Sequence, residues 1–330
     1  MVSVMAEFGA VISPDSDVPE ISAIVTCYNE EQSIDEFHRR LVQALTEQQR
    51  TFELIMVNDG SVDETFSRLR ALFDAGPTVA VAIDLFRNAG QSAAITAGVT
   101  HARGRIILLM DSDLQLDPKD VGLLLAEYDK GQDVVSGYRQ QRQDSPIRTI
   151  PSRLANAIMR RASRSELRDF GCTFKLFNGT LLRAFQLSPT RLFSPAQVIG
   201  AAAHVVDVPV SHAPRRYGSS GWTLAKLWDY NMDNVVAMLR RPFQIVAGGC
   251  LALGLLFALR ISSTAFFDFS VLPTVTTGLL LNVAILSVLV TLGLLCLIGE
   301  FVVRNFIASQ QLPKYIIRTL LSRHGESFGD

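Results

Sequence analysis

The sequence predicts an α/β protein with a mostly parallel sheet, followed by an apolar part towards the C-terminal end. Short apolar runs alternate with amphipathic stretches over residues 20–110, a pattern typical of strands that alternate with helices in a parallel sheet. The 330 residues are 48% hydrophobic and 19% charged, with a mean hydropathy of +0.24. The high hydrophobic content excludes a disordered chain. Because soluble domains carry about 25% charged residues, the low charge argues against a wholly soluble protein.

Four short aliphatic runs, bounded by polar residues or glycine, predict buried strands over residues 21–27, 52–57, 79–86 and 105–110. The stretches between them predict helices over residues 31–48, 62–74 and 90–102. In sheets of this kind, ligands bind at the carboxyl ends of the strands. The chain contains neither GxGxxG nor GxxxxGK[ST], so it lacks the fingerprints of dinucleotide and P-loop sites.

The residues around this α/β region divide into three further parts. Residues 1–19 have no basic start and no apolar core, which predicts a disordered leader rather than a signal peptide. We expect one globular domain over residues 20–221. Residues 222–241 carry two tryptophans and apolar residues near helical spacing, which favours an amphipathic helix in the membrane interface. The alternative is an ordinary helix packed on the core.

Two long uncharged stretches follow, Pro242–Leu259 and Phe269–Gly299. A bilayer core of about 30 Å needs roughly 20 apolar helical residues, so the second stretch is long enough to span it. The first is shorter and has the alternative of a buried helix in a soluble core. We predict a transmembrane hairpin over residues 242–303, with spans at about 242–266 and 277–300, and a juxtamembrane tail over 304–330. Basic residues outside both ends of the hairpin place those ends in the cytoplasm.

The formal net charge of −1 conceals a strong asymmetry along the chain. Residues 1–138 hold 10 basic and 22 acidic residues, whereas residues 139–241 hold 16 basic and 6 acidic ones. An acidic first part suits a divalent cation, and a basic middle part suits an anionic partner such as a phosphate or a membrane surface. The alternative for the basic part is a solvated arginine-rich helix face. The four cysteines form no CxxC pair, so neither a zinc site nor a redox motif is indicated.

Polar side chains stand at the ends of three predicted strands. They are Thr26, Tyr28, Asn29 and Glu30 after the first strand, Asn58 and Asp59 after the second, and Asp111, Ser112, Asp113 and Gln115 after the fourth. Two carboxylates separated by one residue can both face a hard cation, and Mg²⁺ or Mn²⁺ keeps positions open for phosphate oxygens. An Asp-x-Asp in a surface turn is the alternative, but three polar strand ends on one edge favour a site.

The ordered motifs of the chain resemble those of a known family. They are SAIVTCYNEE, VNDGSVDET, RNAGQSAAITAGVTHARG, DSDLQLDP, GQDVVSGYRQQRQDS, DFGCTFKLF, VPVSHAPRRYGSS and GEFVVR. This set is similar to family 2 glycosyltransferases with the Rossmann-like GT-A fold, and in particular to polyprenyl-phosphate glycosyltransferases. Those include bactoprenol glucosyltransferases, formamido-arabinose transferases of lipid A modification and dolichol-phosphate mannose synthases. The resemblance covers residues 20–305.

The resemblance implies an inverting transfer of a sugar from a nucleotide-diphosphate sugar to a polyprenyl phosphate such as undecaprenyl phosphate. By analogy the nucleotide is UDP, and the product is a lipid-linked monosaccharide for cell-envelope glycans or lipid A. The resemblance further implies a multi-pass protein of the bacterial inner membrane with a cytoplasmic catalytic domain, and a homotetramer in some relatives. It implies no nucleic-acid partner.

Residue roles follow from the matched motifs. The resemblance implies a Mg²⁺ or Mn²⁺ site at Asp111, Asp113 and Gln115, and nucleotide-sugar binding by Thr26, Tyr28, Asn29, Glu30, Asn58, Asp59, Gln91, Asp111 and Ser112. It implies catalytic roles for Asp169, Arg139 and Arg153, and acceptor-phosphate binding by Arg153, Arg216 and Ser219. Asp169 matches a proposed base or acceptor-orienting carboxylate, with a helix cap or a structural arginine partner as the alternative.

Three positions depart from the family pattern. Asn58 stands where relatives usually have Asp, Gly221 where they have Lys, and Ser112 where they prefer Ala. The loss of charge at the first two positions leaves room for a catalytically inactive nucleotide-sugar binder, although the intact Asp111 and Asp113 pair speaks against it. A processive polysaccharide synthase is the other alternative, but the chain has no QxxRW motif.

Overall fold

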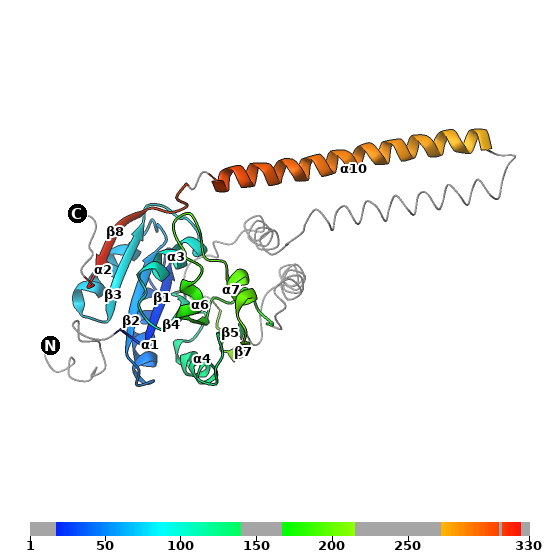
Figure 1. Cartoon of the computed structure of the whole chain (residues 1–330). Coiled ribbons are helices and arrows are strands. Elements are labelled where there is room, and N and C mark those ends of the chain that lie inside the picture. The colour runs from blue at the N-terminus through cyan, green and yellow to red at the C-terminus, as the bar shows by residue number, and fades with distance from the viewer. Residues whose placement is uncertain (1–17, 140–166, 215–271, 310–311, 325–330) are drawn as a thin grey trace. The chain divides into compact units, whose positions relative to one another are not determined.

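The computed structural model describes residues 18–139, 167–214, 272–309 and 312–324, shown in colour in Figure 1. The chain divides into two compact units, one made of Met1–Met238 with Pro313–Asp330 and the other of Leu239–Leu312. The predicted leader, the interfacial helix over 222–241 and the first span over 242–266 lie outside the described residues, apart from the last two residues of the leader.

The first unit is built on an eight-stranded sheet in the order β7-β5-β6-β4-β1-β2-β3-β8. Its strands are β1 (Ile21–Cys27), β2 (Phe52–Asn58), β3 (Val79–Leu85), β4 (Ile106–Asp111), β5 (Val134–Arg139), β6 (Lys175–Asn178), β7 (Val205–Val210) and β8 (Ile317–Ser322). The pairs β1–β2, β2–β3, β1–β4 and β5–β7 are parallel, whereas β6 and β8 run antiparallel to their neighbours. The four predicted strands and the mostly parallel sheet are therefore confirmed.

The helices of the first unit are α1 (Ile34–Thr46), α2 (Thr65–Ala75), α3 (Gln91–His101), α4 (Val121–Tyr128), α6 (Gly179–Arg183) and α7 (Pro195–Ala201), with a 3-10 turn over Pro118–Asp120. The three predicted helices are confirmed as α1, α2 and α3. In α1 the apolar residues recur at helical spacing, so one face is buried while Asp35 and Glu36 in the first turn favourably face the positive end of the helix dipole.

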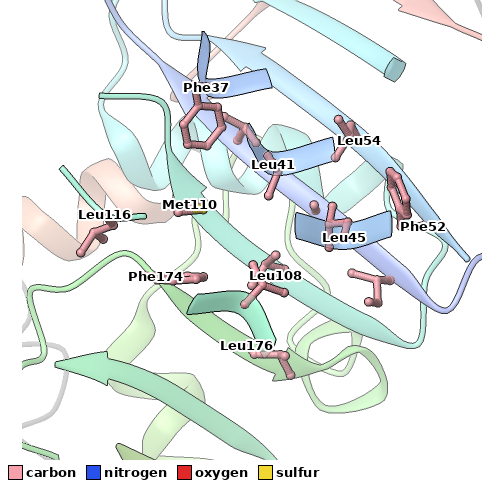
Figure 2. Close-up of a cluster of buried hydrophobic side chains, with 14 of the residues drawn as sticks. Phe37, Leu41, Leu45, Phe52, Leu54, Leu108, Met110, Leu116, Phe174 and Leu176 are labelled. Carbon is pink, nitrogen blue, oxygen red and sulfur yellow. The ribbon is translucent and has the colours of Figure 1, made fainter. Parts of the chain in front are cut away.

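Helices lie on both faces of the sheet, and each face has its own core. On one face, Phe37, Leu41 and Leu45 of α1 pack over the strands that carry Leu54 and Leu108 (Figure 2). On the other face, small residues of α3 pack against the alternate strand residues. The central strands β1, β2 and β3 are buried along their whole length, as expected for a sheet covered on both sides.

The strand β8 was not predicted from the sequence, which assigned residues 304–330 to a juxtamembrane tail. It pairs antiparallel with β3, with Ala82 opposite Leu321 and Asp84 opposite Thr319. The backbone hydrogen-bonding groups on that side of β3 are thereby paired instead of exposed at a sheet edge. A strand of six residues is stabilised mainly by the neighbour it joins, and the sequence does not reveal that neighbour.

The second unit contains α10 (Leu272–Ser309), a helix of 38 residues that includes the predicted span over 277–300. Within the described parts of the chain, no helix is long and apolar enough to cross a membrane. The predicted transmembrane hairpin therefore stays a prediction.

Candidate functional site

The residues predicted for the nucleotide sugar and the metal lie where the central parallel strands end. In the register of the sheet, Thr26 lies opposite Asp111 and Cys27 lies opposite Asn58, so the ends of β1, β2 and β4 are level. This alignment places the polar residues that follow the three strands at one edge of the sheet, in agreement with the prediction for parallel strands.

Asp111, the last residue of β4, is held by three side chains. The hydroxyl of Thr26 and the amide of Gln91 donate to its Oδ1 at 2.6 and 2.7 Å, and the hydroxyl of Thr173 donates to its Oδ2 at 2.7 Å. Gln91 also donates to Thr173 Oγ1 at 3.1 Å. Since a carboxylate has roughly four lone-pair positions, these bonds fix its orientation and leave about one position for a further ligand.

The loop after β4 turns sharply and carries the other acidic residue of the motif. Ser112 is 1% exposed, and its backbone N–H and hydroxyl both lie 3.2 Å from the carbonyl oxygen of Thr26. Leu114 has a φ of +57°, and Asp113 accepts a hydrogen bond from the backbone N–H of Gln115 at 3.1 Å. The half-buried Asp113 thus follows Asp111 on a loop whose shape is set by its neighbours.

The donor set of this loop fits a hard divalent cation. Asp111 and Asp113 offer carboxylate oxygens, and Mg²⁺ is commonly held by one or two carboxylates together with phosphate oxygens of a substrate. Across the described residues, no three His, Cys, Asp or Glu side chains form a group that could hold a metal ion by themselves. A cation here would therefore need ligands from elsewhere, such as a bound diphosphate.

Two further loops form the rim beside β1. Asn29 has a φ of +55°; its backbone N–H donates to Ser61 Oγ at 2.9 Å, and its side-chain Oδ1 accepts from the N–H of Val62 at 3.0 Å. Tyr28 is 39% exposed at this rim. Glu30 is buried and accepts a hydrogen bond from Ser33 Oγ at 2.5 Å, which favours a structural role at the start of α1.

Asp59 connects the turn after β2 to the loop after β3 by hydrogen bonds. The residue is 5% exposed, and its carboxylate accepts from the backbone N–H of Ala89 at 2.8 Å and of Gly90 at 3.0 Å. Burial raises the pKa of Asp59 from its ordinary 3.8 to about 6, although the two N–H donors oppose that rise. The predicted contact with the nucleotide base would thus be made by a carboxylate that also holds the loop before Gln91.

Arg139 and Asp169 form a close ion pair at the end of β5. Arg139 Nε donates to Asp169 Oδ2 at 2.7 Å and Nη2 donates to Oδ1 at 3.0 Å, in the two-pronged geometry that arginine makes with carboxylates. The side chains are 17% and 10% exposed. The sequence left open whether Asp169 is a base or an arginine partner, and the structure gives it an arginine partner.

Two residues near this pair were missed by sequence reasoning. Thr173 reaches Asp111, and Lys175 is 2% exposed, with its Nζ donating to the carbonyls of Phe170 at 3.2 Å and of Cys172. Burial lowers the pKa of Lys175. In the sequence, these two residues stand out only because a threonine and a lysine interrupt the apolar residues 172–177, which lead into β6.

The basic acceptor residues predicted from the sequence, Arg153, Arg216 and Ser219, lie outside the described residues, as does the departure at Gly221. The segment that leads to Arg216 is described up to residue 214. There the N–H of Ala213 donates to the carbonyl of Gln115 at 2.8 Å. The chain therefore passes beside the Asp111–Gln115 loop three residues before Arg216.

Comparison with known proteins identifies the family to which the chain belongs. The family model "Glycosyl transferase family 2" matches residues 22–187. The chain belongs to glycosyltransferase family 2, and the GT-A-like α/β fold with a mostly parallel sheet, predicted from the resemblance, is confirmed.

Within this family, the chain is similar to relatives that share one name. An undecaprenyl-phosphate 4-deoxy-4-formamido-L-arabinose transferase of Pseudomonas fluorescens is 31% identical over 317 residues, covering 91% of this chain and 90% of the relative. A protein of the same name from Pseudomonas aeruginosa is 35% identical over 243 residues, 72% of each chain. Among solved structures, a glucosyl-3-phosphoglycerate synthase of Mycobacterium tuberculosis matches with a TM-score of 0.49 at 16% identity, covering 70% of this chain and 86% of that one.

Proposed function

We propose that this protein transfers a sugar, with inversion, from a nucleotide-diphosphate sugar to undecaprenyl phosphate. The observation that carries the proposal is the similarity to undecaprenyl-phosphate 4-deoxy-4-formamido-L-arabinose transferases over 90% of the length of one such relative. The similarity thus extends well beyond the 22–187 region of the family model. The donor is UDP-linked, and a formamido-arabinose is the first sugar to test.

The donor binds at the carboxyl ends of β1, β2 and β4. Asn29, Asn58 and Asp59 face the nucleoside, while Thr26, Gln91 and Ser112 shape the loop that carries Asp111. The hydrogen bonds that converge on Asp111 support this assignment, because they order a carboxylate at the edge of the sheet where ligands of such folds bind. Tyr28 and Glu30 complete the nucleotide-binding motif by resemblance.

A divalent cation, Mg²⁺ or Mn²⁺, would be held by Asp111 and Asp113, with Gln115 beside them. When bound, it would neutralise the charge that develops on the departing diphosphate. The protein contributes an ordered Asp111, a half-buried Asp113 and a loop fixed by the Gln115 backbone. Because a phosphate ester has its second pKa near 6, the acceptor is already an anion near neutral pH and needs little base catalysis.

The main task of the protein is then to hold two repelling anions at attack distance. Arg139, Arg153, Arg216 and Ser219 would bind the phosphate groups of donor and acceptor. Asp169 orients Arg139, a role supported by the pair of hydrogen bonds between them. The contact between Ala213 and Gln115 brings the last described residues of this segment to the loop that carries Asp111 and Asp113.

The protein would be anchored in the bacterial inner membrane by a hairpin of two spans, with the α/β unit in the cytoplasm. The two uncharged stretches of sequence support this, and so do the basic residues on their outer flanks. A homotetramer is suggested only by resemblance.

The test is a transfer assay on the full-length protein in detergent. A panel of UDP-sugars, beginning with UDP-4-deoxy-4-formamido-L-arabinose, is incubated with undecaprenyl phosphate, and lipid-linked sugar is detected by mass spectrometry. We expect product with at least one donor, and none without the lipid phosphate. Sugar transfer that does not need the lipid phosphate would contradict the proposed acceptor.

The metal assignment is tested in the same assay with Asp113→Ala. We expect transfer to fall by about 100-fold or more, since losing even a residue that only supports a metal ligand commonly costs about 10- to 100-fold, and Asp113 would be a ligand itself. Asp117→Ala is the matched control, because Asp117 lies on the same stretch but pairs with the exposed Lys119 at 3.3 Å. Equal activity of Asp113→Ala and the control would exclude Asp113 as a metal ligand.

A further inference from the structure

The C-terminal strand β8 places an arginine beside a buried carboxylate of β3. Arg318 Nη1 lies 3.3 Å from Asp84 Oδ2, and Arg318 Nη2 donates to the carbonyl of Phe86 at 2.6 Å. The guanidinium also lies over the Phe86 ring, 5.0 Å from its centre. Asp84 is 2% exposed, and a buried carboxylate without a charged or hydrogen-bonding partner would be strongly destabilising. Arg318 therefore supplies the compensating charge for Asp84.

Asp84 in turn holds Asn58 at the end of β2. Asn58 is 1% exposed and donates from Nδ2 to Asp84 Oδ1 at 2.7 Å, while its Oδ1 accepts from Ser61 Oγ at 2.5 Å. Ser61 Oγ accepts from the backbone N–H of Asn29 at 2.9 Å. A continuous set of polar contacts, an ion pair followed by hydrogen bonds, thus runs from β8 through β3 and β2 to the rim after β1.

This arrangement explains why residue 58 is an asparagine. A carboxylate at this position would face the carboxylate of Asp84 across a buried hydrogen-bond distance, where two negative charges repel each other strongly. The asparagine amide instead donates to Asp84 and still accepts from Ser61. Asn58 and Asp84 form a matched pair, and Arg318 balances the one charge that the pair retains.

We propose that β8 is part of the donor site, and that Arg318 is a positioning residue for nucleotide binding. Through Asp84 it holds Asn58, and through Asn58 it holds the Asn29 and Ser61 loops in the shape that receives the nucleoside diphosphate. The inference rests on the proposed function, since the bound nucleotide is the one that this function requires. Arg318 does not touch the reacting atoms.

The test compares Arg318→Met with Arg323→Met in the full-length protein. Arg323 follows the same strand, lies 4.3 Å from the centre of the Phe73 ring and donates to the carbonyls of Val79 and Gly76. It therefore anchors β8 in a similar way at a distance from Asp84. For Arg318→Met we expect the donor KM and the Kd for UDP to rise about tenfold, because a charged hydrogen-bonding partner is lost.

The same variant should leave kcat and the KM for undecaprenyl phosphate within about twofold of the wild type, as expected when only ground-state donor binding changes. Arg318→Lys should recover part of the affinity, since lysine keeps the charge without the planar fork. If Arg318→Met kept wild-type affinity for UDP, or lost no more of it than Arg323→Met, the positioning role would be wrong.

A second set of variants tests the matched pair directly. Asn58→Asp alone should weaken UDP binding, whereas Asn58→Asp combined with Asp84→Asn should regain part of it, because the amide then donates in the opposite direction although Arg318 no longer faces a carboxylate. A double variant as weak as the single one would contradict the pairing. If the wild type binds UDP but transfers no sugar to undecaprenyl phosphate, the proposed acceptor is wrong. The UDP affinities of the variants then still decide the role of Arg318.

Discussion

At the scale of single residues, Asp59 gives the site a measurable dependence on pH. Burial raises its pKa from 3.8 to about 6 in the folded protein, so the folded state binds this proton more tightly than the unfolded state. The contribution of Asp59 to stability therefore falls as the pH rises from about 4 to about 6, and stays constant above that range. A shift of this size corresponds to about 3 kcal/mol.

The comparison that isolates this effect is between the wild type and Asp59→Asn. We expect the free energy of unfolding of the wild type, relative to the variant, to drop by about 3 kcal/mol between roughly pH 4 and pH 7. The hydrogen bond from Ala89 or Gly90 that the amide cannot accept adds an offset that does not vary with pH. Denaturant unfolding over this range measures the difference, and a constant difference would show that Asp59 has an ordinary pKa.

The sequence pattern identified site residues at the ends of predicted strands. It did not identify the residues that contact them from distant parts of the chain. Asp111 and Thr26 were found because each stands at the end of a clear apolar run. Thr173 donates to Asp111 from the segment before β6, 62 residues later in the chain. Neither its residue type nor its spacing indicates that β6 pairs antiparallel with β4. Arg318 was missed for the same reason, since its partner Asp84 is 234 residues earlier.

At the scale of elements, the turn after β2 and the loop after β3 are packed backbone against backbone. Gly60 has a φ of +62°, and a Cβ atom placed on it would lie 2.2 Å from the carbonyl carbon of Arg87. Only glycine fits this position, because both the backbone conformation and the neighbouring backbone exclude a side chain. The close approach is what allows Asp59 to reach the N–H groups of Ala89 and Gly90.

We therefore predict that Gly60→Ala is much more damaging than Gly131→Ala. Gly131 also has a positive φ, +93°, but a Cβ atom there would meet nothing within 4 Å, so its substitution should cost only backbone strain of about 1 kcal/mol. Gly60→Ala adds a clash with backbone and should cost about 2 kcal/mol more, together with weaker UDP binding. Unfolding by denaturant and calorimetry with UDP measure both effects. Equal losses in the two variants would contradict the packing described.

The elements that could be predicted are those whose own residues form a clear apolar or helical pattern. The strands β1 to β4 and the helices α1 to α3 carry patterns long enough to identify without their partners. The strands β5, β6, β7 and β8 have at most two consecutive hydrophobic residues, whereas β1 to β4 have three to five. Such strands form because a partner edge is available, and the partner is a property of the whole fold.

At the scale of the whole molecule, the chain leaves the α/β unit and later returns to it. Residues 239–312 form the second unit, and Pro313–Asp330 rejoins the first. Within the returning segment, Tyr315 and Leu320 are 5% and 3% exposed and belong to the core on the α3 face of the sheet. The returning strand is therefore an integral part of the α/β unit.

This organisation predicts opposite outcomes for two deletions. Removing residues 313–330 should expose the edge of β3, whose seven residues are all buried, and leave an unpaired row of backbone groups that promotes aggregation. Replacing residues 239–312 by a flexible Gly/Ser linker of about 20 residues, which spans roughly 25 Å, keeps β8 on β3.

We expect the linked variant to give a discrete species in size-exclusion chromatography and to bind UDP, and the truncated one to aggregate. If both behaved alike, β8 would contribute little to the integrity of the α/β unit. If the linked variant alone bound UDP, the result would show that the donor site needs the strand that follows α10 but not α10 itself.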